Sequence, residues 1–314
     1  MGISFVPGPV TVRVPATSAN LGPGFDALGL ALAHHDEVTA RVASAGCHVE
    51  VTGEGAGELP DDDSHLVVRA MYETFDELGG RPTGIRLSCV NRIPQARGLG
   101  SSSAAIVAGV QLARGLVSDG VQRLDTASAL RIAARIEGHP DNVAPCLLGG
   151  FTIAWVEPDG ARAVSLPVSG EVRATVFVPT SRGLTEVARA ALPEQVPHAD
   201  AAFVAGRAAL LVHALTTEPA LLLAATEDRL HQDYRAPGMP ASAELVAALR
   251  AEGVAAVISG AGPSVLALSH VPDDFSPGMD WQVHSLLVDV SGAQIEGAIV
   301  GHAERDPVAA GRMS

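Results

Sequence analysis

A turn rich in glycine and serine leads into an apolar, helix-forming segment at residues 93–116, IPQARGLGSSSAAIVAGVQLARGL. The start of a helix leaves backbone N–H groups unpaired and carries a partial positive charge, so it can bind an anion without a basic side chain. Gly98 and Gly100 allow the backbone to fold closely around such an anion, and Ser101, Ser102 and Ser103 add hydroxyl donors. The spacing therefore predicts a loop that binds a triphosphate.

Two other interpretations of this stretch stay open at the level of the residues alone. The glycines could form a plain turn whose serines cap the helix. A dinucleotide-binding loop of the GxGxxG type fits less well, because it would require glycine at Ser103 and an acidic residue at the end of the next strand.

The basic residues are all arginine, since the 21 residues counted as lysine plus arginine include no lysine. This excludes a Walker phosphate loop, a pyridoxal Schiff base and the strand lysine of protein kinases. A formal net charge of −14 argues against a nucleic acid or an anionic membrane surface as partner. An anionic small molecule would therefore have to bind at a local site.

The cysteines and the N-terminus point to a soluble cytoplasmic protein that does not bind membranes. Cys47, Cys89 and Cys146 form no CxxC pair, which fits reduced thiols and argues against structural zinc. The opening segment MGISFVPGPV lacks the charged and apolar regions of a signal peptide. The longest uncharged run, from Gly253 to Ser269, contains glycine and proline and fits two strands around a turn better than a membrane span.

The chain of 314 residues is long enough for two domains. Alternating apolar residues predict strands at VTVRVP, DEVTARVA, CHVEVTG and GIRLSCV, and helical spacing predicts helices over 64–78, with Ser64 as N-cap, 101–117 and 126–137. Strands and helices recur after LGGFTIAWVEPDGARAV, so both halves have an α+β pattern. We place the domain boundary there, with domains over 1–158 and 159–314.

Three segments stand in the order and chemistry of the signature motifs of the GHMP small-molecule kinases: VRVPATSANLGPGFDALGLAL, IPQARGLGSSSAA and ISGAGPSVLAL. Within that superfamily, SANLGPGFD and EGHPDNVAPCLLGG resemble the homoserine kinases, and the resemblance covers essentially the whole chain. It implies the α+β, two-domain GHMP kinase fold, with a left-handed βαβ unit in the N-terminal domain and a ferredoxin-like C-terminal domain. The active site is expected in the cleft between them.

The resemblance also implies an activity, the ATP-dependent phosphorylation of the side-chain hydroxyl of L-homoserine to O-phospho-L-homoserine in threonine biosynthesis. Magnesium would accompany the ATP and take a hydroxyl and a carboxylate as protein ligands, for which Ser102 and Glu137 are the matching residues. The expected ATP contacts are Pro94, Gln95, Ala96, Arg97, Gly98, Leu99, Gly100, Ser101, Ser102, Ser103, Gly260 and Gly262.

A pocket for L-homoserine should offer arginine to the carboxylate and an acid to the ammonium group. By resemblance, Arg189 and Arg235 take the carboxylate and Asp26 takes the ammonium group. The expected polar positioning groups are Asn20, His139, Asn142 and Thr185.

Two alternatives describe how the hydroxyl loses its proton. Asp141 could accept the proton if it faced the hydroxyl. The resemblance instead suggests that Asn142 faces the substrate and that no dedicated base exists, and we favour this second alternative.

Other functions remain open to the sequence. The chain could be a GHMP kinase for another alcohol, such as shikimate, mevalonate or a sugar, or a sensor that binds ATP and an amino acid without turnover. An oxidoreductase is suggested by the glycine-rich turns alone. The helix start DSHLVVRA carries His65 where the family commonly has asparagine, so the adenine contact is left unassigned. A homodimer is compatible with the family, but no pattern of residues in the sequence identifies a dimer interface.

Overall fold

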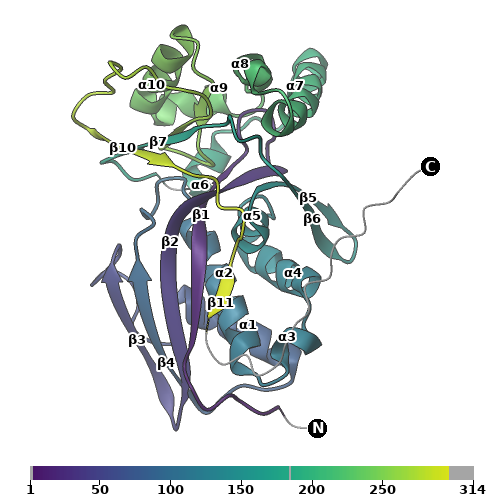
Figure 1. The fold of residues 1–314 in the computed structure, drawn as a ribbon, viewed down its shortest axis with the longest axis vertical. Helices are drawn as coiled ribbons and strands as arrows, with labels where there is room; N and C mark the ends of the chain where they lie inside the picture. Colours follow the sequence, from purple (N-terminus) through teal and green to yellow (C-terminus); the bar gives the residue numbers. More distant parts are fainter. Residues whose placement is uncertain (1–2, 184, 297–314) are drawn as a thin grey trace.

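The computed structural model describes residues 3–183 and 185–296, which form two lobes, each built on its own β-sheet (Figure 1). The N-terminal lobe contains the strands β1 (Val10–Ala19), β2 (Leu28–Ala43), β3 (Gly46–Gly53), β4 (Gly84–Asn91), β5 (Phe151–Glu157), β6 (Gly160–Leu166) and β11 (Gln294–Glu296). The C-terminal lobe contains β7 (Ala174–Pro179), β8 (Ala256–Ile258), β9 (Val265–Ala267) and β10 (Trp281–Leu286).

Helices cover one side of each sheet (Figure 1). The N-terminal lobe has α1 (Leu66–Leu78), α2 (Ser101–Leu116), α3 (Gly120–Arg123), α4 (Thr126–Glu137) and α5 (Val143–Leu148). The C-terminal lobe has α6 (Thr185–Ala190), α7 (His198–Thr216), α8 (Leu222–Ala225), α9 (Gln232–Arg235) and α10 (Pro240–Ala251), with the 3-10 turns η1 (Pro219–Leu221) and η2 (Ala236–Gly238).

The order of the strands matches the predicted fold class. In the larger sheet the order is β11-β1-β2-β4-β3, and the β5–β6 hairpin extends from β2. Strands β3 and β4 are parallel neighbours connected by α1, which is the βαβ unit that the family resemblance implies; its hand stays a prediction. The smaller antiparallel sheet has the order β10-β7-β9-β8, so its strands lie fourth, first, third, second, as in a ferredoxin-like domain.

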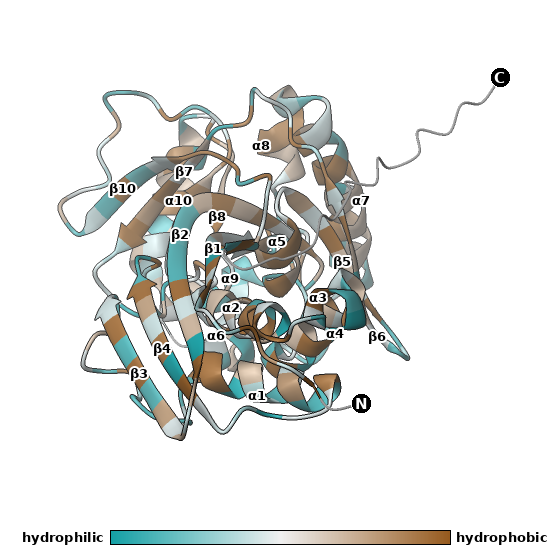
Figure 2. Cartoon of the chain, turned by 60° about the horizontal axis from the view of Figure 1, so that its bottom comes forward, coloured by the Kyte–Doolittle hydropathy of each residue, from teal (hydrophilic) through white to brown (hydrophobic). Residues whose placement is uncertain are grey.

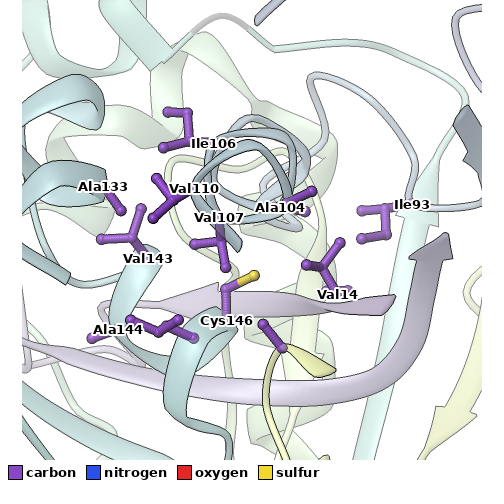
Figure 3. Close-up of a cluster of buried hydrophobic side chains, with 14 of the residues drawn as sticks. Val14, Ile93, Ala104, Ile106, Val107, Val110, Ala133, Val143, Ala144 and Cys146 are labelled. Atoms are coloured by element: carbon purple, nitrogen blue, oxygen red, sulfur yellow. The ribbon is translucent and has the colours of Figure 1, made fainter. Parts of the chain in front are cut away.

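Helix α2 runs through the N-terminal lobe and is buried along most of its length. Figure 3 shows its side chains Ala104, Ile106, Val107 and Val110 among those of other elements, including Val143. A helix that is buried on nearly all sides must be largely apolar, which explains why Arg114 is the one charged residue of α2. The Nε of this buried arginine donates to the carbonyl oxygen of Leu124. Figure 2 shows the contrast with β3 and β4, where hydrophobic and hydrophilic residues alternate because one face of these strands is exposed.

The chain passes between the two lobes twice, once between β6 and β7 and again between β10 and β11. Strand β11, near the end of the described residues, returns to the N-terminal sheet and pairs with β1. On the way, Val288 forms a β-bridge with Leu32 of β2, and Asp289 makes a 2.6 Å ion pair with His35. The hairpin of β5 and β6 spans residue 158, and a domain boundary at that position stays a prediction.

Most predicted elements appear with small shifts at their ends. The helix predicted over 126–137 is α4, and the run from Gly253 to Ser269 forms β8, a turn and β9, as predicted. The assignment of Ser64 as the N-cap of α1 is wrong. The cap is His65, whose Nδ1 accepts the Val67 N–H, while the Ser64 hydroxyl donates to Asp62.

One described helix, α7, has the length and apolar composition that a membrane span requires. It packs beside α8 in the C-terminal lobe, and 22% of its apolar window is buried there.

Helix α2 can lie close to α1 because residue 109 has no side chain. A Cβ at Gly109 would lie 2.4 Å from the carbonyl oxygen of Val67 and 2.7 Å from Cβ of Ala70, both on α1. We expect Gly109→Ala to destabilise the fold by about 1–3 kcal/mol, because it forces the two helices apart. Gly206→Ala in α7 is the matched control, since nothing lies within 4 Å of its Cβ. It should gain about 0.5–1 kcal/mol from helix propensity. Urea unfolding of both variants measures the change in the free energy of unfolding. Equal changes in the two variants would contradict the close contact between α1 and α2 at Gly109.

Candidate active site

A cavity of about 480 Å³ opens between the lobes at the N-terminal end of α2. This volume lies in the range of sites that enclose a small ligand. Both lobes line it: the N-terminal lobe contributes the loop 20–26, the segment 94–102 and the end of α4, and the C-terminal lobe contributes α6, α9 and the turn at 260–261. All the residues that the sequence predicts for the site line this cavity except Ser103 and Gly262.

The phosphate loop, residues 94–103, adopts a shape that only glycine permits at two positions. Gly98 and Gly100 have left-handed backbones, with φ of 72° and 71°. A Cβ on Gly98 would lie 2.2 Å from the carbonyl oxygen of Ser259, and one on Gly100 would lie 1.9 Å from Oγ1 of Thr17. The loop is therefore packed between β1 and the turn that follows β8.

The first turn of α2 leaves its backbone donors available. Gly100 is the N-cap, and no side chain caps this helix. Among the described residues, the N–H groups of Ser101, Ser102 and Ser103 have no hydrogen-bond partner. The interpretation of the serines as helix caps is therefore not what the structure shows. Unpaired amides at the start of a buried helix form an anion-binding site.

The third motif holds the phosphate loop from the opposite lobe. Oγ of Ser259 donates to the carbonyl oxygen of Gly98 at 2.7 Å, and the N–H of Ser264 donates to that of Arg97 at 3.3 Å. Gly262 lies in the same turn, where there is no room for a side chain, because a Cβ would lie 2.6 Å from Sδ of Met239. The shape of the loop thus depends on both lobes.

Glu137, the last residue of α4, meets the serines of the phosphate loop. Its Oε1 accepts the hydroxyls of Ser102 at 2.8 Å and Ser103 at 2.7 Å. Ser103 is fully buried and does not line the cavity, but its hydroxyl contacts the carboxylate of Glu137, which does. The described residues contain no group of three or more His, Cys, Asp or Glu side chains that could hold a metal. A hydroxyl and one carboxylate fit magnesium, which takes its other ligands from phosphates and water.

Charged side chains of both lobes meet at another part of the cavity. Arg189 of α6 donates to both carboxylate oxygens of Asp26, at 2.8 and 3.0 Å. The hydrogen bond to Asp26 raises the pKa of Arg189, against the opposing effect of burial. Thr185 lies one turn earlier on α6 and also lines the cavity.

Arg235 is a buried cation that lacks an ionic partner among the described carboxylates. It is only 3% exposed. Its Nε donates to the carbonyl oxygen of Ala188 at 3.1 Å, and its Nη1 to that of Gly260 at 3.3 Å. Burial lowers its pKa, and the positive charge of Arg189 lowers it further. The charges of Asp26, Asp228 and Asp141 act in the opposite direction, but none of these carboxylates forms an ion pair with Arg235. Because a buried charge without an ion-pair partner is costly, this part of the cavity favours an anionic ligand.

The loop between β1 and β2 is held in a strained shape. Asn20, Leu21 and Asp26 have positive φ values of 67°, 51° and 55°, which residues other than glycine seldom adopt. The Asn20 side chain restrains the loop: its Nδ2 donates to the carbonyl oxygen of Gly260 at 2.9 Å, and its Oδ1 accepts the N–H of Asp26 at 3.0 Å. Asn20 thus fixes Asp26 relative to the C-terminal lobe.

Both candidates for contact with a reacting hydroxyl line the cavity, and each is already bonded. Asp141, 2% exposed, pairs with Nδ1 of His139 at 2.5 Å. The bond to Asp141 raises the pKa of His139 despite its burial. Asn142 accepts the hydroxyl of Thr17 at 2.8 Å through its Oδ1. Thr17 was missed by the sequence analysis, although it lies within the first motif.

A further part of the cavity, beside α1, is largely apolar and includes Val38, Leu66 and Val67 in its lining. His65 is 3% exposed there, and its Nε2 has no hydrogen-bond partner among the described residues. Burial lowers its pKa, which favours the neutral ring. Because Nδ1 accepts the Val67 N–H, Nε2 carries the proton and can donate to a ligand.

Two other buried side chains near the site escaped the sequence analysis. Asp36 lines the cavity and accepts the backbone N–H groups of Arg92 and Ile93, at 2.5 and 2.8 Å, just before the phosphate loop. His231 lies behind Arg235 and contacts it at 3.1 Å. Neither stands in a pattern that singles it out: the partners of Asp36 are backbone groups distant in sequence, and His231 also contacts the distant backbone carbonyl of Gly22.

Comparison with known proteins identifies the family. The model of the GHMP kinases N terminal domain matches residues 65–150, and that of the GHMP kinases C terminal domain matches 205–275. The chain is 55% identical over 298 residues to a homoserine kinase of Streptomyces coelicolor, covering 94% of this chain and 96% of the relative. The chain belongs to the homoserine kinases of the GHMP kinase family. A homoserine kinase of Clavibacter michiganensis is 51% identical, covering 91% of this chain and 94% of the relative.

Solved structures agree with this family. The crystal structure of a homoserine kinase from Cytophaga hutchinsonii superposes with a TM-score of 0.79 at 28% identity, covering 94% of this chain and 100% of the other. A mevalonate diphosphate decarboxylase from Staphylococcus aureus shares the fold with a TM-score of 0.62 at 14% identity, covering 92% of this chain and 98% of the other. The two-lobed α+β fold of this family is thus confirmed for the chain.

A substitution in the phosphate loop tests its dependence on glycine. Gly98→Ala adds a methyl group against the backbone of Ser259 at a left-handed position, so we expect nucleotide affinity to fall about tenfold or more as the loop is displaced. Gly46→Ala is the control, because its φ of 73° is equally strained but nothing lies within 4 Å. It should lose about 1 kcal/mol of stability without any change in nucleotide affinity. Calorimetric titration with ADP distinguishes them, and equal affinities would contradict the account.

The pair formed by His139 and Asp141 can be tested by titration. Because the pKa of His139 is raised above 6.5, the stability from this pair is fully present below pH 6.5 and is lost as the pH rises through the raised value. Asp141→Asn should lower the pKa of His139 in an NMR titration and remove this component of stability. Thr17→Val, which breaks only the bond to Asn142, should leave the pKa of His139 in place. An unchanged His139 pKa in Asp141→Asn would refute the pairing.

Proposed function

We propose that the chain transfers the γ-phosphoryl group of ATP to the side-chain hydroxyl of L-homoserine, giving O-phospho-L-homoserine and ADP on the route to threonine. The observation that carries the proposal is that the unpaired amides at the start of α2 and the buried cation Arg235 belong to one cavity. The first suits a polyphosphate and the second suits a carboxylate.

The charged groups account for an amino-acid substrate better than for another alcohol. A carboxylate near Arg235 and Arg189 would neutralise a costly buried charge, and an ammonium group near Asp26 would replace the guanidinium that Asp26 now binds. Asn20 and Thr185 supply neutral polar groups beside them. Shikimate, mevalonate and sugars lack an ammonium group, so they offer no group that would take the place of the Arg189 guanidinium at Asp26 and release it for a carboxylate.

Ser102 and Glu137 are proposed as the residues that hold magnesium with the nucleotide. When bound, the ion neutralises charge on the phosphate oxygens. Glu137 lies within hydrogen-bonding distance of two hydroxyls of the phosphate loop, so its carboxylate lies beside the predicted triphosphate. His65 and the apolar part of the cavity are proposed to receive the nucleobase.

In the proposed step, the hydroxyl oxygen of homoserine bonds to the γ-phosphorus as the bond from that phosphorus to the β-phosphate oxygen breaks. Because such transition states are loose, alignment and charge neutralisation supply most of the rate enhancement. Asp141 is buried and its carboxylate is hydrogen-bonded to His139, which argues against a role as the base that accepts the hydroxyl proton. Asn142 is proposed to orient the hydroxyl, whose proton is released late to phosphate oxygen or water.

The decisive experiment measures ADP release from magnesium ATP with L-homoserine, L-threonine, shikimate and mevalonate in parallel. We expect L-homoserine to give the highest kcat/KM. Arg235→Met should raise the KM for homoserine about 100-fold or less, since it removes charged hydrogen bonds, and should leave the KM for ATP nearly unchanged. Arg229→Met is the control, because Arg229 is an exposed arginine of the same lobe paired with Asp200.

Two of the alternative functions, another small-molecule kinase and a sensor, have their own outcomes. Preferred turnover of another alcohol, unaffected by Arg235→Met, would identify a different small-molecule kinase. ATP binding without turnover of any of these alcohols would favour a sensor. Either result would refute the proposed function.

A further inference from the structure

One buried histidine contacts both sides of the charged end of the cavity. His231, immediately before α9, is fully buried. Its Nε2 lies 2.8 Å from the carbonyl oxygen of Gly22, in the loop that carries Asn20 and Asp26. Its Nδ1 lies 3.1 Å from Nη1 of Arg235. A single imidazole thus links the loop of the N-terminal lobe to the arginine of the C-terminal lobe.

The hydrogen bonds fix the state of this ring. Arginine has only donors, so Nδ1 of His231 must present its lone pair to Arg235. The proton is then on Nε2 and is donated to the carbonyl oxygen of Gly22. A protonated ring would place an N–H and a positive charge against the guanidinium. Burial lowers the pKa of His231 even though Asp228, whose Oδ2 lies 3.5 Å from Nε2, acts in the opposite direction. The direction of the shift agrees with the neutral tautomer that the contact with Arg235 favours.

The surroundings leave the ring little freedom to move. The ring of Phe25 packs against it with centroids 5.3 Å apart, and the same Phe25 ring lies 5.4 Å from the guanidinium carbon of Arg235. Gly22 is pressed against the C-terminal lobe, because a Cβ there would lie 2.6 Å from the carbonyl oxygen of Thr226. His231 therefore donates to a loop that is both strained and tightly packed.

We propose that His231 is a positioning residue that fixes the ammonium side and the carboxylate side of the substrate pocket relative to each other. The inference rests on the proposed function, because it assumes an amino-acid substrate. The ammonium group is assigned to Asp26, on the loop that His231 holds through Gly22. The carboxylate is assigned to Arg235, which His231 holds through Nδ1.

A parallel link shows what His231 adds. The carbonyl oxygen of Gly260 accepts both Asn20 Nδ2 and Arg235 Nη1, so the backbone also bridges the two sides. This bridge restrains Asn20 and one guanidinium nitrogen, but it does not reach Gly22, where the β1–β2 loop packs against Thr226 of the C-terminal lobe. Removing His231 should therefore loosen substrate recognition without abolishing folding.

Two conservative variants separate the two contacts. Asparagine places its side-chain oxygen near the position of Nδ1, so His231→Asn keeps an acceptor for Arg235 and loses the bond to Gly22. Glutamine places its amide nitrogen near the position of Nε2, so His231→Gln keeps the donor to Gly22 and loses the acceptor for Arg235. His231→Phe fills the space and loses both contacts. His213→Phe, an exposed histidine on α7, is the control.

The experiment compares homoserine with two truncated compounds that compete with it. The compound 4-hydroxybutyrate lacks the ammonium group, and 3-aminopropan-1-ol lacks the carboxylate. The KM for homoserine and the inhibition constants of both compounds are measured for each variant, together with the KM for ATP and the melting temperature. The ratio of each inhibition constant to the KM reports how well the pocket recognises the missing group.

In His231→Phe we expect both ratios to fall about tenfold. This factor corresponds to the loss of one charged hydrogen bond between the pocket and the substrate's ammonium group, and of one between the pocket and its carboxylate. His231→Asn should restore the ratio for 3-aminopropan-1-ol, and His231→Gln should restore the ratio for 4-hydroxybutyrate. The KM for ATP and the behaviour of His213→Phe should match the unmodified protein. If His231→Phe does not fold, the opposite effects of the other two variants carry the test.

The inference is overturned if His231→Asn and His231→Gln each change both ratios equally, or if all three His231 variants change only the melting temperature. That failure is distinct from failure of the proposed function, which would appear as absence of homoserine turnover in the unmodified protein. Homoserine turnover with unchanged ratios would leave the proposed function standing and remove His231 from it.

Discussion

The site depends on one constraint: the N-terminal end of α2 is held at the wall of a cavity with its first amides unpaired. Gly98 and Gly100 make this possible, because their left-handed backbones and the absence of a Cβ let the loop pass against Ser259 and Thr17. The apolar surface of α2 then fixes the helix within the core. In a chain without lysine, the proposed function assigns to these backbone dipoles the role that a cationic side chain has in other phosphate sites.

The second feature of the site is that neither lobe forms it alone. The third motif of the C-terminal lobe supports the phosphate loop, and the β1–β2 loop of the N-terminal lobe meets α6 and α9. The cavity therefore joins the unpaired amides at the start of α2 to the buried Arg235, which forms no ion pair with a described carboxylate. A substrate that carries its own positive and negative charges is the ligand for which this arrangement costs least.

The sequence predicted the parts of this arrangement that depend on local patterns. The helix over 126–137, the strands on either side of the turn at 260–263 and the helix start after Gly100 all follow from periodicity, glycine and serine. The family resemblance brought together Asn20, Asp26, Arg189 and Arg235, which no local rule connects. Thr17, Asp36 and His231 escaped because each acts through a partner that is distant in sequence, and Ser64 was preferred to His65 as a cap because serine is the commoner capping residue.

The most direct test of the central claim is a crystal structure of the protein with a non-hydrolysable ATP analogue and magnesium. The account predicts that phosphate oxygens accept hydrogen bonds from the backbone N–H groups of Ser101, Ser102 and Ser103. A structure in which those amides bond within the protein, while the phosphates lie elsewhere, would contradict it.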